Sequence, residues 1–299
     1  MDDVRSPLLP PDEFVASPDN SVDGTPRTST SRNPIEARSN YRRLQGGKCS
    51  VKRQRHFVYG AIYNNIFPGS HVLDPIDGNV DLYVILPSME VSIIEIRLIF
   101  PDEGKGKDTL LSSVLSLGRS CHGAGNSRGS RVGDLGMMHA LGVRSATSRE
   151  VFVGTNEKSK RIERVSNLMR HWMEDNLRST LKSILDDDTH CTAMKPLSFM
   201  PAGPGSRVIL SVDLANAPHY DTNDVSKSVA VWVEEKPGQA ENWYFVFPNI
   251  RLDGKDGVLV RLRHGTTISW DGRKIFHCTS RTDPGPGNKV YGCMWAASR

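Results

Sequence analysis

From residue 205 onward the chain is divided by turn-forming residues into short segments rich in valine, isoleucine and aromatic residues. Turn signals include Lys236-Pro-Gly238, Asp253-Gly254, Asp271-Gly272 and the Pro-Gly-Pro-Gly run at 284–287. Segments of this length between such turns are typical of β-strands. The expected strands are 207–214, 228–234, 243–248, 257–262, 267–270, 273–279 and 289–296. Since no helix alternates with these strands, a parallel Rossmann-like sheet is disfavoured.

The middle of the chain adds two further strands and one long helix to this pattern. Residues 80–86 and 91–100 are expected to be strands, and one of them completes the strand count of a double-sheet jelly roll. Apolar residues recur at three- and four-residue steps over 156–187, which predicts a helix packed on a sheet. The predicted fold class is α+β, mostly β: a double-stranded β-helix (jelly-roll or cupin-like) core, a long supporting helix and a disordered N-terminal arm.

The expected organisation is a disordered segment, residues 1–55, followed by one folded domain, residues 56–299. Residues 56–204 would form the support and residues 205–299 the β-helix core. The first 37 residues hold few large apolar side chains, too few to offset the entropy of ordering the chain. Residues 38–55 then carry seven lysines and arginines and no acidic residue. That basic segment fits a phosphate-binding arm, a nuclear import signal or a solvated linker.

Several classes of protein are disfavoured by the composition. Five scattered cysteines without a CxxC pair argue against a disulfide framework or a structural zinc site. The longest apolar stretch, residues 80–100, is interrupted by charged residues and proline and cannot cross a membrane. No signal peptide is evident, so we expect a nuclear or cytoplasmic protein, and a monomer.

The residues that predict chemistry lie in Ala217-Pro-His219-Tyr-Asp221. In an extended segment, residues i and i+2 point to the same side, so His219 and Asp221 could bind one metal ion together. His277, on the penultimate predicted strand, is the preferred third ligand, and His264 is its rival. Two histidines and one carboxylate leave coordination positions open, as in Fe(II) oxygenases. Cys278 would point away from such a site, which weakens a thiolate-bearing zinc site.

These motifs resemble a known superfamily. The HxD pair, the late histidine and a terminal strand with a basic residue resemble the 2-oxoglutarate/Fe(II) dioxygenases. Within that superfamily, HYDTND, VAVWVEE, WYFVFPN and HGTTISWDGRKIFHCTS are similar to the TET/JBP-related oxygenases of algae and other protists, over residues 130–299. The resemblance implies that His219, Asp221 and His277 are catalytic metal ligands, with Fe(II) and O₂ as cofactors.

The resemblance also implies a co-substrate, for which three residues are candidates. The superfamily places an arginine after the late histidine to pair with the far carboxylate of 2-oxoglutarate. This chain has Lys289 near that place and Arg281 earlier in a turn. Lysine pairs with a carboxylate as a point charge rather than as a two-pronged fork. One algal branch uses ascorbate instead and shares a second acid three residues after the first, here Asp224. The alternative role for Asp224 is to cap the turn after the ligands.

Members of the resembled family oxidise the methyl group of pyrimidine bases in DNA. The expected function is therefore modification of 5-methylcytosine or thymine in DNA, with duplex DNA as the partner and base flipping as the mode of access. Three alternatives stay open: the same chemistry on a protein side chain or small molecule, a non-catalytic binding module on a decayed barrel, and a cupin-like enzyme with another divalent metal.

Overall fold

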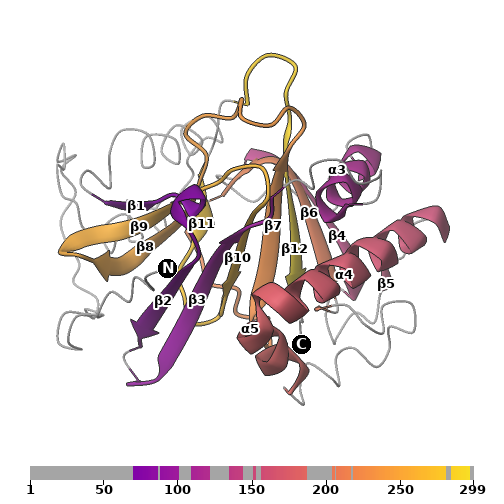
Figure 1. The fold of residues 1–299 in the computed structure, drawn as a ribbon. Coiled ribbons are helices and arrows are strands. Elements are labelled where there is room, and N and C mark those ends of the chain that lie inside the picture. Colours follow the sequence, from indigo (N-terminus) through magenta and orange to yellow (C-terminus); the bar gives the residue numbers. More distant parts are fainter. Residues whose placement is uncertain are drawn as a thin grey trace, which may run out of the picture.

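Two β-sheets face each other, and helices cover the outer side of the larger one (Figure 1). The structure is a computed structural model that describes residues 70–86, 88–100, 109–121, 135–143, 151–152, 156–186, 204–205, 207–216, 218–280 and 284–296. The predicted arm, residues 1–55, lies outside the described residues. The two-sheet, mostly β architecture confirms the fold class predicted from the sequence.

The large sheet has eight strands and the small sheet four. In spatial order the large sheet holds β2 (Val80–Ile85), β3 (Val91–Leu98), β10 (Thr266–Trp270), β7 (Ser228–Glu234), β12 (Val290–Ala296), β6 (Arg207–Ala215), β4 (Leu135–Val143) and β5 (Val151–Phe152). The small sheet holds β1 (His71–Leu73), β9 (Lys255–Arg261), β8 (Tyr244–Leu252) and β11 (Cys278–Thr279). Only β1 and β9 pair in parallel among the described strand pairs; the others are antiparallel, as expected for a jelly roll.

Strand β7 shows how the sequence divides the core in two. All seven of its residues are buried, because side chains of successive residues point to opposite faces and both faces are covered. Val229, Val231 and Val233 face the helices, and Ala230 and Trp232 face the small sheet. The space between the sheets is filled mainly by aromatic and branched side chains, namely Phe245, Phe247, Val258, Val260, Ile94, Ile96 and Ile268.

Within the described part of the chain, three α-helices and a short 3-10 helix accompany the sheets. They are η2 (Pro75–Asp77), α3 (Leu110–Cys121), α4 (Asn156–Asn176) and α5 (Arg178–Leu185). The long helix predicted over 156–187 is confirmed, although it is interrupted at Leu177, where α4 ends and α5 begins. Its predicted apolar stripe, including Ile162, Val165 and Met169, packs against the large sheet. Among the described helices, none is long and apolar enough to span a membrane.

The structure departs from the predicted elements in three places. Only Cys278–Thr279 of the strand predicted at 273–279 is a strand, because Asp271 accepts backbone hydrogen bonds that form a turn at Lys274 and Ile275. Helix α3 continues to Cys121, into residues 118–136, a segment whose glycine and serine content favours a loop. The large sheet combines strands from both sides of residue 205, so the division between support and core does not divide the sheet.

Candidate metal centre

Two short extended segments meet at the open end of the space between the sheets. His219 and His277 form an isolated antiparallel bridge, with N–H to carbonyl distances of 2.9 Å from His219 to His277 and 3.1 Å in return. Two residues later, the backbone N–H of Asp221 donates to the carbonyl of Gly272 at 2.8 Å. The backbone thus joins residues 219–221 to residues 272–277, two segments that are far apart in the sequence.

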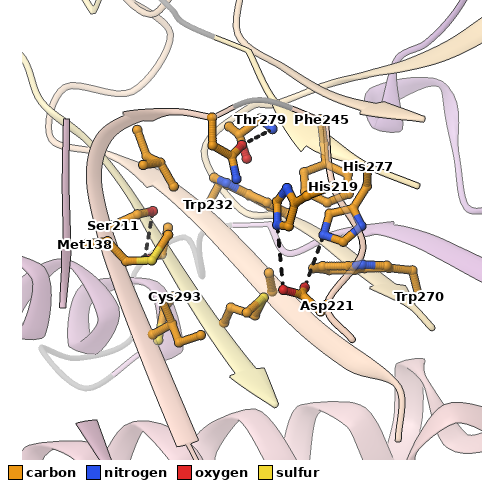
Figure 2. A pocket seen from close by; sticks show the side chains of 16 residues that line it. Met138, Ser211, His219, Asp221, Trp232, Phe245, Trp270, His277, Thr279 and Cys293 are labelled. Atoms are coloured by element: carbon orange, nitrogen blue, oxygen red, sulfur yellow. Dashed lines mark hydrogen bonds and ion pairs between the residues drawn. The ribbon is translucent and has the colours of Figure 1, made fainter. Parts of the chain in front are cut away.

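The three predicted ligands converge in this arrangement. One ligand atom from each of His219, Asp221 and His277 lies within 4.8 Å of the others (Figure 2). The Nε2 atom of His277 is 3.2 Å from Oδ2 of Asp221, and Nε2 of His219 is 3.6 Å from Oδ1. Burial raises the pKa of the Asp221 carboxyl, but hydrogen bonds and charge from the two histidines outweigh burial and hold that pKa well below its usual range. Asp221 is therefore an ionised carboxylate, as metal binding requires.

His277 is oriented by its surroundings. Its Nδ1 lies 2.9 Å from the carbonyl oxygen of Ile275, which is an acceptor, so Nδ1 carries a proton and Nε2 is the nitrogen that would bind a metal ion. The ring stacks on Phe245, with 5.4 Å between centroids, and meets the ring of Trp270 edge-on at 5.2 Å. A ligand histidine whose second nitrogen donates to a carbonyl is the usual arrangement in metal sites.

A pocket of about 550 Å³, part of it open to solvent, adjoins the three side chains. Its lining is mainly apolar and aromatic, with Ser211, Asn216 and Thr279 as neutral polar groups. Two neutral imidazoles and one carboxylate suit Fe(II) and, beside a pocket, leave room for further ligands. The donor set therefore fits the 2-His-1-carboxylate site of non-haem Fe(II) oxygenases.

The rival ligands considered from the sequence lie elsewhere. Nδ1 of His264 is 3.1 Å from both the backbone N–H and the carbonyl of Glu234, and burial lowers the pKa of this histidine. The Cys278 thiol is fully buried, and burial raises its pKa far above its ordinary value, so it stays neutral. Neither residue belongs to the group of converging donors.

Two of the predicted co-substrate residues, Lys289 and Asp224, are not among the described residues that line the pocket. Lys289 pairs with Asp213 at 2.9 Å and does not line the pocket. Asp224 is buried, with Oδ1 accepting from Arg207 at 2.9 Å and Oδ2 from Ser228 at 3.0 Å. These contacts give both residues structural partners within the chain. Lys289 directly precedes strand β12. The turn after Asp221 places the Asp224 carboxylate beside Arg207, the first residue of β6. Arg281 lies outside the described residues.

Two residues outside the ligand motif also shape the site. The Asn216 side-chain oxygen accepts from the backbone N–H of Thr279 at 2.7 Å, and this bond ties the end of β6 to β11 beside the histidine bridge. Trp270 lines the pocket and touches His277. The position of Trp270 directly before the Asp271-Gly272 turn is the sequence feature that points to a role in the site. Aromatic residues on strands more often belong to the hydrophobic core.

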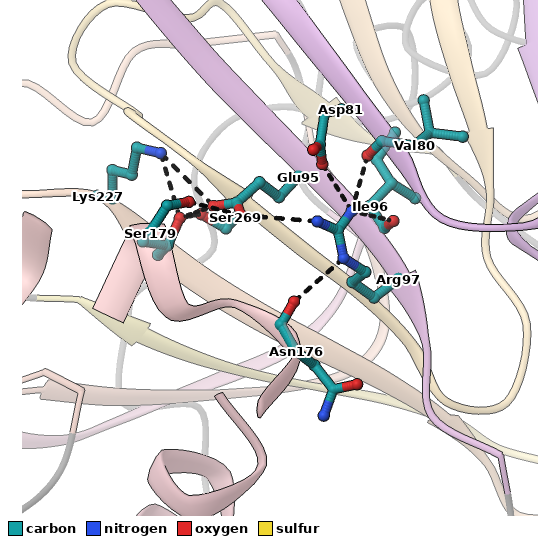
Figure 3. Close-up of polar contacts among 10 residues, drawn as sticks. Val80, Asp81, Glu95, Ile96, Arg97, Asn176, Ser179, Lys227 and Ser269 are labelled. Carbon is teal, nitrogen blue, oxygen red and sulfur yellow. Dashed lines mark hydrogen bonds and ion pairs between the residues drawn. The ribbon is translucent and has the colours of Figure 1, made fainter. Parts of the chain in front are cut away.

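Behind β10, a buried polar cluster joins the sheet to helix α5 (Figure 3). Glu95 of β3 accepts hydrogen bonds from Ser179 and Thr180, and it lies 3.7 Å from the Lys227 ammonium. Thr180 also contacts Ser269 at 2.8 Å. Burial lowers the pKa of Lys227 although Glu95 partly opposes this effect. Since Ser269 directly precedes Trp270, the cluster anchors the strand end that borders the metal centre.

Replacing Glu95 by glutamine tests this anchor. We expect Glu95→Gln to lower the free energy of unfolding by about 1–3 kcal/mol, because a buried ammonium and two hydroxyls lose a charged acceptor. The measurement is urea denaturation followed by circular dichroism. Asp81→Asn is the matched control, since Asp81 pairs with Arg97 at a more exposed position and its loss costs about 1 kcal/mol or less. Equal effects of the two changes would contradict an anchoring role for Glu95.

Similarity between this chain and known proteins is low in sequence and limited in structure. No protein-family model and no curated protein sequence matches the chain. Among solved structures, NgTET1 in complex with 5mC DNA is 10% identical, with a TM-score of 0.49 over 85% of this chain and 91% of that one. A prolyl hydroxylase from Trichoplax adhaerens, bound to a hypoxia-inducible-factor peptide, is 12% identical, with a TM-score of 0.37 over 67% and 82%.

A 2OG-Fe(II) oxygenase family protein from Burkholderia pseudomallei is 10% identical, with a TM-score of 0.34 over 85% of this chain and 95% of that one. At these identities the likeness concerns the fold alone. The assignment of the metal site rests on the convergence of His219, Asp221 and His277.

Proposed function

We propose that this chain is a mononuclear non-haem Fe(II) dioxygenase that modifies the methyl group of a pyrimidine base in DNA, 5-methylcytosine or thymine. The observation that carries the proposal is the convergence of two imidazoles and one ionised carboxylate beside a pocket. Fe(II) held there would allow O₂ to oxidise a methyl group, a reaction that amino-acid side chains cannot carry out by themselves. A nuclear or cytoplasmic location accords with this proposal.

The chain's own residues bind and orient the reactants. His219 and His277 would hold the metal through Nε2, and Asp221 would supply the single negative charge among the ligands. Phe245 and Trp270 pack around His277, which is 3% exposed, and keep water from that side of the site. A site shielded in this way limits side reactions of the oxidant.

The proposed co-substrate is 2-oxoglutarate, and ascorbate is the alternative. Ser211, Asn216 and Thr279 are the polar groups that the described lining offers to the outer end of either molecule. A buried far carboxylate would need a cationic partner. None of the described lining residues is a lysine or arginine, and Arg281, two residues beyond Thr279, is the remaining candidate of the sequence.

Two features support a DNA substrate. The basic segment 38–55 has the composition of a phosphate-binding arm, and the motifs around His219 and His277 resemble enzymes that act on DNA bases.

The decisive experiment uses duplex DNA with 5-methylcytosine at defined positions. The full chain is incubated with Fe(II), O₂ and either 2-oxoglutarate or ascorbate, and the released nucleosides are analysed by mass spectrometry. We expect 5-methylcytosine to decrease and a heavier nucleoside to appear, with one co-substrate only. Asp221→Ala protein, treated identically, should produce neither change.

Other outcomes redirect or remove the proposal. Co-substrate consumption without any change in DNA would favour an oxygenase of proteins or small molecules. Purified protein that binds no Fe(II) would favour a non-catalytic module, and activity restricted to another divalent metal would favour a cupin-like enzyme.

A further inference from the structure

The indole N–H of Trp270 is a buried donor without an acceptor among the described residues. The side chain is 1% exposed, and it lines the pocket beside Asp221 (Figure 2). Buried N–H groups are nearly always hydrogen-bonded, so an unpaired one at the edge of a site indicates an acceptor that becomes available when a ligand binds.

The backbone places this donor close to the Asp221 carboxylate. Trp270 is the last residue of β10, and Gly272, which follows it in the turn, accepts the hydrogen bond from the Asp221 backbone. A Cβ atom at Gly272 would lie 3.1 Å from Oδ2 of Asp221 and 3.4 Å from Nε1 of Trp270. The two polar groups therefore border the same small space, which glycine leaves open.

Metal binding changes the hydrogen bonds of Asp221. Without metal, each carboxylate oxygen faces one histidine nitrogen, at 3.2 and 3.6 Å. A metal ion takes the lone pairs of both nitrogens and one carboxylate oxygen, and the other oxygen then needs a new donor. Asp221 is the only carboxylate among the described residues that line the pocket.

We propose that Trp270 is a positioning residue of the metal centre: its indole N–H donates to the Asp221 oxygen that does not bind the metal. This bond holds Asp221 as a ligand through one oxygen and keeps the remaining coordination positions open. The inference rests on the metal site of the proposed function, and it adds a residue that the ligand motif does not contain.

The test is Co(II) binding to the full chain, followed by visible absorption, which reports on coordination without turnover. Trp270→Phe keeps an aromatic ring and removes the N–H. We expect Co(II) affinity to fall by about 10–100-fold, the usual cost of losing an outer hydrogen bond to a metal ligand. The Co(II) absorption bands should also change, because the carboxylate is no longer held through one oxygen.

Two further variants separate positioning from packing. Trp243→Phe makes the same change in the same core, at a residue that is 2% exposed and does not line the pocket, and it should leave Co(II) affinity and absorption unchanged. Gly272→Ala keeps the indole N–H but places a methyl group against Asp221 and Trp270, and it should lower the affinity. Thermal unfolding of each metal-free variant controls for folding.

The outcomes are distinguishable. Wild-type protein that binds no Co(II) removes the proposed metal site and this inference with it. Wild-type binding together with unchanged affinity and absorption in Trp270→Phe overturns this inference alone. If Trp270→Phe fails to fold, unchanged affinity in Gly272→Ala overturns it, and reduced affinity with normal stability supports it.

Discussion

Asp221→Ala is expected to abolish turnover and to lower Fe(II) affinity by more than about a hundredfold, since losing only an outer partner of a ligand costs about 10–100-fold. Asp221 supplies the only negative charge among the three ligands, and both histidine Nε2 atoms face its oxygens. The measurement is iron bound per chain after anaerobic reconstitution, together with product formation. The fold should persist, because backbone bonds to Gly272 and between the two histidines hold the segment without the side chain.

A matched control variant separates the loss of a metal ligand from the loss of a carboxylate elsewhere in the protein. Asp256→Asn removes a carboxylate from an exposed ion pair with Arg251 on the small sheet, and it should change neither iron content nor turnover. Circular dichroism of both variants should match wild type. Normal iron content in folded Asp221→Ala protein would contradict the assignment of the metal centre.

Much of the fold was predictable because its signals are local. Alternation along 228–234 and the turn sequences around it predict the central strand β7, and the strand at 289–296 is found within one residue. The apolar stripe of 156–187 predicts the long helix. The i, i+2 spacing likewise predicts that His219 and Asp221 face one side, and the structure brings both to His277.

Other features depended on pairing between distant segments, which one sequence does not display. The 273–279 region contains branched and aromatic residues typical of a strand. Its first half is nevertheless a turn, because the backbone N–H groups of Lys274 and Ile275 donate to the Asp271 carbonyl. Strand β4 belongs to the large sheet because it pairs with β6. Composition alone does not show that these two distant segments pair. Asn216 and Trp270 acquire their roles only when the end of β6, the turn at Gly272 and His277 come together.

The second large effect is expected at Asp224. Its carboxylate and the Arg207 guanidinium form an ion pair whose side chains are 1% and 6% exposed, and Ser228 donates to the same carboxylate. Asp224→Ala would leave a guanidinium that cannot lose its proton in a buried site. We expect a loss of about 3–5 kcal/mol in the free energy of unfolding. In a domain of this size that corresponds to a fall in Tm of roughly 6–20 °C, measured by calorimetry.

The double variant Arg207→Met/Asp224→Leu distinguishes a structural pair from a co-substrate ligand. Replacing both members of a buried ion pair by apolar residues is often nearly neutral, so the double variant should recover most of the stability lost in Asp224→Ala. If Asp224 is structural, the double variant should also retain the wild-type KM for the co-substrate. A double variant that is stable but has a strongly raised KM for ascorbate would return Asp224 to the co-substrate role suggested by its spacing from Asp221. Because both carboxylate oxygens of Asp224 already have partners, we expect stability and KM to recover together.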